Sequence, residues 1–211
     1  MTLTVGVTGG TGFLGKQLIK SLIKEDVNVI SLQRSHKQIA TTSTRYFDLS
    51  DLSTLNEDLL NGIDVIIHAA ALVHDASAEE EKHKSLNSDA TSKLFSLSKS
   101  VGVKKFIFVS TVGVYGVSSS SSILSIDTEI NPLTPYAKAK RASEIELLGD
   151  KSSDIAVSVL RLPLVIGKNA PGNYGFLEKI SKTKFPLPFG LTDNKRSVIS
   201  VGVAAQVMAE A

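Results

Sequence analysis

The chain has 211 residues, 42% of them apolar, so it can bury the core of one ordinary domain. Its 23 basic and 21 acidic side chains nearly balance, which argues against a nucleic-acid or anionic-membrane surface and favours small-molecule partners. The lack of cysteine excludes disulfides, thiolate metal sites and a cysteine nucleophile, and no apolar run approaches the roughly 18 residues of a membrane span. We expect a cytoplasmic protein without a metal site.

Short apolar runs alternate with longer segments that have helical spacing. The runs expected to form strands are Leu3–Val7, Val27–Leu32, Ile63–Ile67, Phe106–Val109 and Ala156–Leu160. The segments expected to form helices are Gly12–Lys24, Leu52–Leu60, Glu79–Val101 and Pro135–Leu148. Runs rich in Val and Ile are typical of strands buried on both faces. The sequence therefore predicts an α/β fold with a doubly wound parallel sheet, the Rossmann fold.

A glycine-rich turn, Thr8–Gly15, joins the first expected strand to the first expected helix. Gly9 permits the tight turn, Gly12 lets the backbone approach a pyrophosphate, and Gly15 lets helix and strand pack closely. The helix N-terminus then offers N–H groups and a positive dipole end to the phosphates. The expected dinucleotide contacts are Gly9, Thr11, Gly12, Phe13 and Leu14. The alternative is a glycine turn that only packs.

The end of the second expected strand indicates which dinucleotide is bound. A site for NAD has an acidic side chain there, whereas an arginine suits the 2′-phosphate of NADP. No Asp or Glu occurs between Val27 and Ala40, so Arg34 favours NADP over NAD unless it is a solvated surface residue. Farther along, Asp48 and Leu49 are expected to border the adenine; a helix N-cap is the alternative for Asp48.

Small residues follow the strand expected at Ile63–Ile67. The segment Ala69-Ala70-Ala71 allows the backbone to lie along the ribose and nicotinamide of a cofactor. His68 ends the preceding apolar run, so we expect a packed structural histidine rather than a base. His74 and Asp75 are too isolated to indicate a relay or a metal site.

A tyrosine and a lysine four residues apart are the strongest candidates for chemistry. Tyr136 and Lys140 leave one face of an expected helix, after a strand that ends in Ser110 and Thr111. Hydride transfer at a carbinol or ketone requires a proton to move at the oxygen, and a free tyrosine, with a pKa near ~10, is a poor base at neutral pH. We expect the Lys140 ammonium and an oxidised nicotinamide to lower the pKa of Tyr136. The alternative is an ordinary amphipathic helix.

Several motifs in this order resemble the extended short-chain dehydrogenase/reductases, also called the NAD-dependent epimerase/dehydratase family. They are the glycine turn, His68-Ala69-Ala70, Asn87 with Thr91, Ser110-Thr111, Tyr115-Gly116, Tyr136 with Lys140, and Arg161-Leu162-Pro163. The resemblance implies that Thr111 bonds the reacting sugar oxygen and that Tyr136 is the acid/base. It implies that Lys140 binds the nicotinamide ribose and tunes Tyr136.

The resemblance also assigns supporting and substrate-binding residues. Asn87 would brace the active-site backbone, and Ser110 and Pro163 would border the cofactor. Asn173 and Arg196 would contact the sugar nucleotide, with Arg196 at its diphosphate.

The resemblance narrows the reaction as well. Sugar dehydratases of this family carry an Asp-Glu pair after the threonine, whereas this chain has Val112-Gly113, so dehydration is disfavoured. The segments 71–74, 185–190 and 194–197 are most similar to bacterial enzymes of surface polysaccharide synthesis. These reduce UDP-linked 4-keto-6-deoxy-N-acetylhexosamines or epimerise at C4. We therefore expect an NAD(P)-dependent oxidoreductase or epimerase that transfers a hydride at C4 of a nucleotide sugar.

Two other functions remain open. The chain could bind NADP as a sensor or scaffold without catalysis, although such proteins usually lack the Tyr136 and Lys140 pair. It could also reduce another small carbonyl substrate, as flavonoid or 3β-hydroxysteroid reductases with this core do. The resemblance further suggests a homodimer packed through the helix that carries Tyr136.

The part of the chain from Pro163 onward departs from the strand and helix alternation. Gly and Pro are frequent as far as Gly190, in a region typical of substrate-side loops rather than sheet; only Tyr174–Ile180 has helical spacing, and a strand at Arg196–Val201 should precede a last helix. We expect residues 1–165 to form the dinucleotide-binding domain. Residues 166–211 would begin a substrate-binding lobe that this sequence holds only in part.

Overall fold

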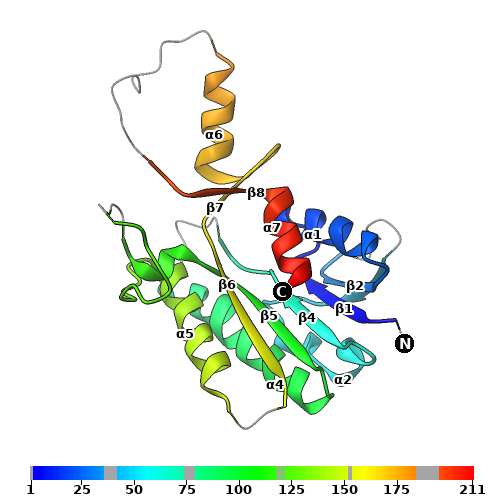
Figure 1. The fold of residues 1–211 in the computed structure, drawn as a ribbon. Helices are drawn as coiled ribbons and strands as arrows, with labels where there is room; N and C mark the ends of the chain where they lie inside the picture. Colours follow the sequence, from blue (N-terminus) through cyan, green and yellow to red (C-terminus); the bar gives the residue numbers. More distant parts are fainter. Residues whose placement is uncertain are drawn as a thin grey trace.

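The computed structural model describes residues 2–35, 42–73, 79–117, 120, 122–151, 154–183 and 195–211. Its centre is a six-stranded parallel sheet in the order β3-β2-β1-β4-β5-β6 (Figure 1). The strands are β1 (Thr4–Thr8), β2 (Asn28–Gln33), β3 (Ser43–Tyr46), β4 (Val65–His68), β5 (Lys105–Thr111) and β6 (Ala156–Leu162). The strand order reverses between β1 and β4, as in a doubly wound sheet. The predicted fold class is confirmed.

Helices lie on both faces of this sheet, and one further helix, α6 (Gly172–Ser181), stands away from it (Figure 1). They are α1 (Phe13–Lys24), α2 (Glu57–Leu60), α3 (Glu80–Lys84), α4 (Ala90–Ser100), α5 (Pro135–Gly149), α6 (Gly172–Ser181) and α7 (Val201–Glu210). The described residues also include two 3-10 turns, η1 (Leu52–Thr54) and η3 (Val112–Tyr115), and one π-helical turn, η2 (Ser85–Asp89).

The apolar residues of each strand serve two cores. Phe106 and Phe108 of β5 face α2, α4 and α5, whereas Ile107 and Val109 face α1 and α7 (Figure 1). This alternation follows from the period of two in a strand, whose successive side chains point to opposite faces. Strands buried on both faces therefore need the nearly uncharged runs that the sequence shows.

Three elements differ from the sequence expectation. The edge strand β3, Ser-Thr-Arg-Tyr, was not among the expected strands because it pairs on one side only and carries few apolar residues. The expected helix Leu52–Leu60 is divided into η1 and α2, since Asp51 and Asn56 each cap a new turn. The expected helix Glu79–Val101 is interrupted by η2.

The last part of the chain is divided between two locations. Strands β7 (Leu164–Ile166) and β8 (Val198–Ser200) pair in parallel as a second small sheet. Strand β8 lies within the strand expected at Arg196–Val201, whereas β7 falls in the region where no sheet was expected. Helix α6 stands away from the main sheet, whereas α7 packs beside α1 and buries Ala204, Ala205 and Met208 (Figure 1). The expected boundary at residue 165 falls within β7.

Parallel pairing brings the carboxyl ends of the central strands to one edge. Thr8 lies in register with His68, and β5 continues to Thr111 at the same end. Ligands of doubly wound sheets bind beyond this edge. Among the residues described here, no helix is long and apolar enough to cross a membrane.

Gly15→Ala should destabilise the fold, because an added Cβ would lie 2.1 Å from the Gly9 carbonyl oxygen, a backbone atom that cannot rotate away. We expect a loss of roughly 1–3 kcal/mol in the free energy of unfolding, measured by urea denaturation. Gly149→Ala is the matched control, since its Cβ would meet no atom within 4 Å at the end of α5. Equal stability of the two variants would contradict the close packing of the glycine turn.

Candidate functional site

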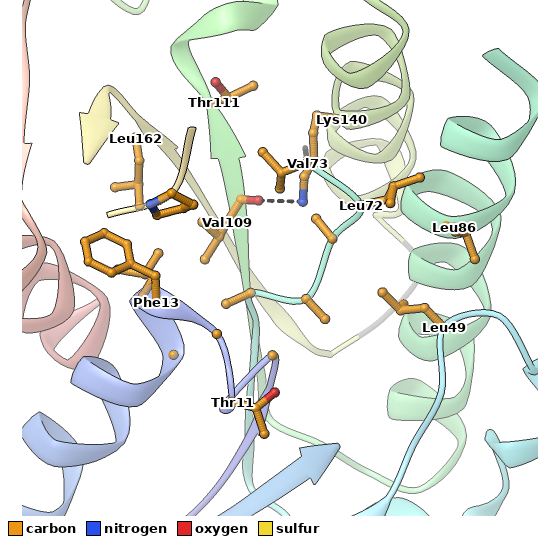
Figure 2. A pocket seen from close by; sticks show the side chains of 18 of the residues that line it. Thr11, Phe13, Leu49, Leu72, Val73, Leu86, Val109, Thr111, Lys140 and Leu162 are labelled. Atoms are coloured by element: carbon orange, nitrogen blue, oxygen red, sulfur yellow. Dashed lines mark hydrogen bonds between the residues drawn. The ribbon is translucent and has the colours of Figure 1, made fainter. Parts of the chain in front are cut away.

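A pocket of about 1150 Å³ lies at the carboxyl edge of the main sheet. Its wall comes from the glycine turn, the ends of β2, β4 and β5, helix α5 and the chain after β6 (Figure 2). The predicted site residues that line it are Gly9, Thr11, Gly12, Phe13, Leu14, Arg34, Asp48, Leu49, Ala69, Ala70, Ala71, Ser110, Thr111, Tyr136, Lys140 and Pro163. Residues that are far apart in the sequence thus share one cavity.

The glycine turn forms one wall. Gly9 has a φ of +74°, and a Cβ there would lie 2.8 Å from the backbone nitrogen of Ala70. The Gly12 amide donates to the Gly9 carbonyl oxygen over 2.9 Å and begins α1 without a side-chain cap among the described residues. A Cβ on Gly12 would meet only that carbonyl, at 3.2 Å. Gly9 is therefore required by packing, whereas Gly12 leaves the uncapped helix terminus open to an anion.

The end of β2 carries no acidic side chain. Gln33 is buried there, accepts from the Ser31 hydroxyl over 2.8 Å and donates to the Ser35 carbonyl over 2.7 Å. Arg34 follows it on the exposed rim of the pocket. Asp48 holds the turn before η1, because its Oδ1 accepts from the amide and the hydroxyl of Ser50.

His68 is fully buried below the pocket and both of its ring nitrogens are hydrogen-bonded. The Thr91 hydroxyl donates to the Asn87 carbonyl over 2.8 Å, so it must accept from Nε2–H of His68, at 2.9 Å. Nδ1 then accepts from the Thr8 hydroxyl over 2.7 Å, and that oxygen accepts from the Ala70 amide. Burial, helped by the charge of Lys140, lowers the pKa of His68 to about 3. His68 is a neutral structural residue.

Asn87 supports the pocket from behind and does not line it. Its Oδ1 accepts from the Leu72 amide over 2.7 Å, and its Nδ2 donates to the Leu72 carbonyl over 3.0 Å. These are the two hydrogen bonds that a neighbouring strand would make. The π-helical turn η2 contains Asn87, and turns of this kind are frequent at functional sites. The arrangement fixes the chain that follows Ala71.

Lys140 crosses from α5 to the end of β5, where its Nζ donates to the Val109 carbonyl over 2.8 Å (Figure 2). The same Nζ lies 4.3 Å from the centre of the Phe108 ring. Burial lowers the pKa of Lys140 to about 7, although the carboxylate of Glu144 acts in the opposite direction. Lys138, two residues earlier, is exposed and pairs with Glu80. Only Lys140 is therefore tied to the pocket.

Tyr136 is half-buried beside the pocket, and its ring lies edge-on to His83 with centroids 6.3 Å apart. Burial raises the pKa of Tyr136 to about 12. The expectation that Lys140 lowers this pKa is wrong for the chain alone. The Lys140 ammonium is 6.0 Å from the centre of the tyrosine ring and donates to Val109 instead, so desolvation of the phenolate outweighs its attraction.

Thr111 ends β5 and caps the turn η3, because its Oγ1 accepts from the Gly113 amide over 3.1 Å. Ser110 also lines the pocket, but its hydroxyl donates to Glu144 over 2.5 Å. Glu144 was not among the predicted site residues. Its place one helical turn after Lys140, on the buried face of α5, is the sequence signal that could have identified it.

Of the predicted substrate contacts, Thr111 lines this pocket but Arg196 does not. Arg196 is exposed before β8 and does not line it. Asn173 belongs to the first turn of α6, and its side chain lies outside the described part of the structure. His74, Asp75, residues 185–190 and Asn194 are also outside the described residues.

Solved structures and known proteins resemble this chain over most of its length. A UDP-glucose 4-epimerase of Vibrio cholerae is 32% identical over 95% of this chain. A decarboxylating sterol-4-alpha-carboxylate 3-dehydrogenase of Dictyostelium discoideum is 34% identical over 77% of it. The structure of MoeE5 in complex with UDP-glucose and NAD is 26% identical, with a TM-score of 0.79, over 97% of this chain and 70% of that one.

This chain covers 64% of the Vibrio cholerae protein and 53% of the Dictyostelium discoideum protein, so it spans less than two thirds of these curated relatives. Residues 5–206 match the NAD dependent epimerase/dehydratase family. That match includes β1, the glycine turn, the Tyr136 and Lys140 pair and most of α7. The chain therefore belongs to the NAD dependent epimerase/dehydratase family.

Proposed function

We propose that this chain holds a nicotinamide dinucleotide and transfers protons in an enzyme that inverts C4 of a UDP-linked sugar by hydride transfer. The observation that carries the proposal is the convergence of Thr111, Tyr136 and Lys140 on one pocket, opposite the glycine turn. The pocket is lined on the other side by the uncapped start of α1, which suits a pyrophosphate. Among relatives, the Vibrio cholerae protein is named a UDP-glucose 4-epimerase, which favours inversion over reduction alone.

The residues of the chain would divide the work by position. A bound dinucleotide supplies the acceptor and donor of the hydride at C4. Tyr136 takes the proton from the C4 hydroxyl during oxidation and returns it to the ketone oxygen during reduction. Thr111, at the end of β5, bonds the same oxygen and orients it toward Tyr136.

Lys140 would contribute charge and orientation. Its ammonium has three donors, of which one binds the Val109 carbonyl, so others can bind hydroxyls of a ribose in the pocket. A second positive charge from an oxidised nicotinamide would favour the Tyr136 phenolate together with Lys140. This offsets the effect of burial, which holds the pKa of Tyr136 near 12 in the chain alone.

For the cofactor, we propose NADP in preference to NAD. Gln33 is neutral and occupied by Ser31 and Ser35, so nothing at the end of β2 repels a 2′-phosphate. Arg34 is exposed on the rim beside it. NAD is the alternative, because MoeE5 was solved with NAD.

The remaining features of the function rest on the sequence resemblance. They are the role of Arg196 at the diphosphate, a cytoplasmic place in bacterial surface polysaccharide synthesis, and a homodimer packed through α5. Exposed Ile145 and Leu148 give α5 an apolar surface that suits such packing. A second candidate function is oxidation of a sterol, which the Dictyostelium discoideum relative favours.

Turnover of UDP-glucose and of UDP-N-acetylglucosamine with each dinucleotide tests the proposal. We expect conversion to the 4-epimer, measured by chromatography, and a loss of at least roughly 100-fold in Tyr136→Phe, because the phenol moves the proton. Calorimetric titration should show unchanged dinucleotide affinity in the variant. Binding without turnover by the unmodified chain would favour a sensor or scaffold, and turnover retained by Tyr136→Phe would remove that residue from its role.

Lys140→Met should abolish turnover yet raise the free energy of unfolding near neutral pH. The folded chain disfavours the Lys140 ammonium, so the unfolded chain binds more protons between the folded pKa of about 7 and the ordinary value of 10.5. The loss of stability caused by the buried ammonium is complete below the folded pKa of about 7 and disappears as pH rises toward 10.5.

We expect the Lys140→Met variant to gain roughly 1 kcal/mol near pH ~6, after the cost of leaving the Val109 carbonyl without its donor, and less near pH ~10. Urea unfolding at both pH values measures the difference. Lys138→Met, which removes an exposed lysine, should show no such gain. A pH-independent effect of Lys140→Met would argue against a buried cation.

Arg34→Ala should weaken NADPH binding by roughly tenfold and leave NADH binding unchanged, because the guanidinium would contact only the 2′-phosphate. Calorimetric titration measures both affinities. Lys24→Ala, at the far end of α1, controls for the loss of one positive charge. An equal change for the two dinucleotides would show that Arg34 does not distinguish them.

A further inference from the structure

A buried carboxylate lies directly behind the candidate site. Glu144 stands one helical turn after Lys140 on α5, and its side chain has no exposed surface. Both of its oxygens are occupied. Ser110 donates to Oε1, Arg161 donates through Nε and Nη2, and Arg141 donates to Oε2 over 3.1 Å. Although burial raises the pKa of Glu144, these donors outweigh it and hold the pKa below its ordinary value.

Two partners of this carboxylate, Ser110 and Arg161, lie next to Thr111 in the sheet. Ser110 and Arg161 are in register on the parallel strands β5 and β6, so both side chains reach the α5 face of the sheet. Arg161 also donates through Nη1 to the Tyr115 hydroxyl over 2.9 Å. Glu144 therefore fixes the residue before Thr111 directly and the end of η3 through Arg161.

The same helix face carries the charged groups of the pocket. Lys140 bonds the Val109 carbonyl, one residue before Ser110, so α5 is attached to β5 at two successive positions. The titratable and charged groups around Lys140 and Glu144 are Tyr136 and Arg141 on α5, Arg161 on β6, Tyr115 in η3, His68 on β4 and His83 on α3. Glu144 is the one carboxylate in that set, and its negative charge partly balances the positive charges of Lys140, Arg141 and Arg161.

Stability alone is a weak reason for this arrangement. An ion pair removed from water costs desolvation energy, and replacement by apolar residues is often neutral or stabilising. A catalytic hydroxyl, by contrast, must be held within about 0.5 Å of its productive position. Thr111 lies where β5 ends and the 3-10 turn η3 begins. Strand pairing fixes the backbone before this junction but not the backbone after it.

We propose that Glu144, with Arg161, is a positioning residue that holds Thr111 by fixing Ser110 before it and Tyr115 after it. This inference rests on the proposed function, because positioning Thr111 matters only if Thr111 meets a substrate. The carboxylate also supplies the negative charge that favours the ammonium of Lys140. Glu144 itself does not line the pocket.

The first test is Glu144→Gln, which keeps the shape and removes the charge. We expect kcat to fall roughly 10- to 100-fold, with KM for the UDP-sugar and dinucleotide affinity changed less than about threefold. The pH at which half of the alkaline activity is lost should shift downward, because Lys140 loses its ammonium at lower pH. Glu144→Asp should restore part of kcat. Glu146→Gln, which changes an exposed carboxylate two residues later that accepts from Ser92, should leave all four quantities unchanged.

A second measurement does not depend on turnover. Hydrogen–deuterium exchange should accelerate at least roughly tenfold at residues 110–116 in Glu144→Gln and remain unchanged in Glu146→Gln. The double variant Glu144→Met/Arg161→Met replaces the buried ion pair with apolar side chains and should fold with near-normal stability while kcat stays low. A folded double variant with low kcat would show that activity is lost through lost positioning rather than through unfolding.

The outcomes distinguish this inference from the proposed function. Absence of turnover in the unmodified chain would overturn the proposed function, and the exchange experiment would still decide whether Glu144 fixes the Thr111 segment. Normal kcat and normal exchange in Glu144→Gln would overturn the inference and leave the proposed function intact.

Discussion

The parallel pairing of β1, β4, β5 and β6 is the constraint on which the candidate site depends. A shift of one residue in any pair would turn every side chain of that strand to the opposite face. The observed register places Thr8 beside His68 and Ser110 beside Arg161, both on the face that α4 and α5 cover. Both polar networks, the neutral one below the cofactor pocket and the charged one behind Thr111, exist only in this register. The chemistry of the pocket is therefore determined by the sheet before any loop contributes.

The two networks differ in the free-energy cost of burying their polar groups. The His68 network is neutral, because each hydroxyl in it donates one hydrogen bond and accepts one, while the ring donates through Nε2 and accepts at Nδ1. The Glu144 network is charged, and its carboxylate is satisfied by two arginines and a serine. Lys140 is different, since the structure gives its ammonium one carbonyl and one aromatic face. A buried cation with so few acceptors lowers stability, which is common at sites kept for function.

Local signals in the sequence predicted the central strands, the glycine turn and helix α5, because periodicity and turn chemistry act within a few residues. Strand β3 was not predicted, since a polar edge strand has no apolar period. The contact of Glu144 with Arg161 joins residues 17 apart through strand register, which no local pattern contains. For the chain alone, the pKa of Tyr136 was predicted in the wrong direction, because burial raises it and Lys140 bonds Val109 rather than the tyrosine. Burial and the actual partner of a cation are tertiary properties.

The pKa shifts of Tyr136 and Lys140 determine how the pocket responds to an added charge. Burial disfavours the phenolate of Tyr136 and the ammonium of Lys140 alike, so the pair tends toward its neutral forms. A positive charge placed in the pocket favours the phenolate and opposes the ammonium, and both changes release a proton. Glu144 opposes the second change, because its buried negative charge favours the ammonium. Under the proposed function, the pair would release the tyrosine proton when a cationic ring enters while Lys140 keeps its charge, which is the state that proton abstraction from a hydroxyl requires.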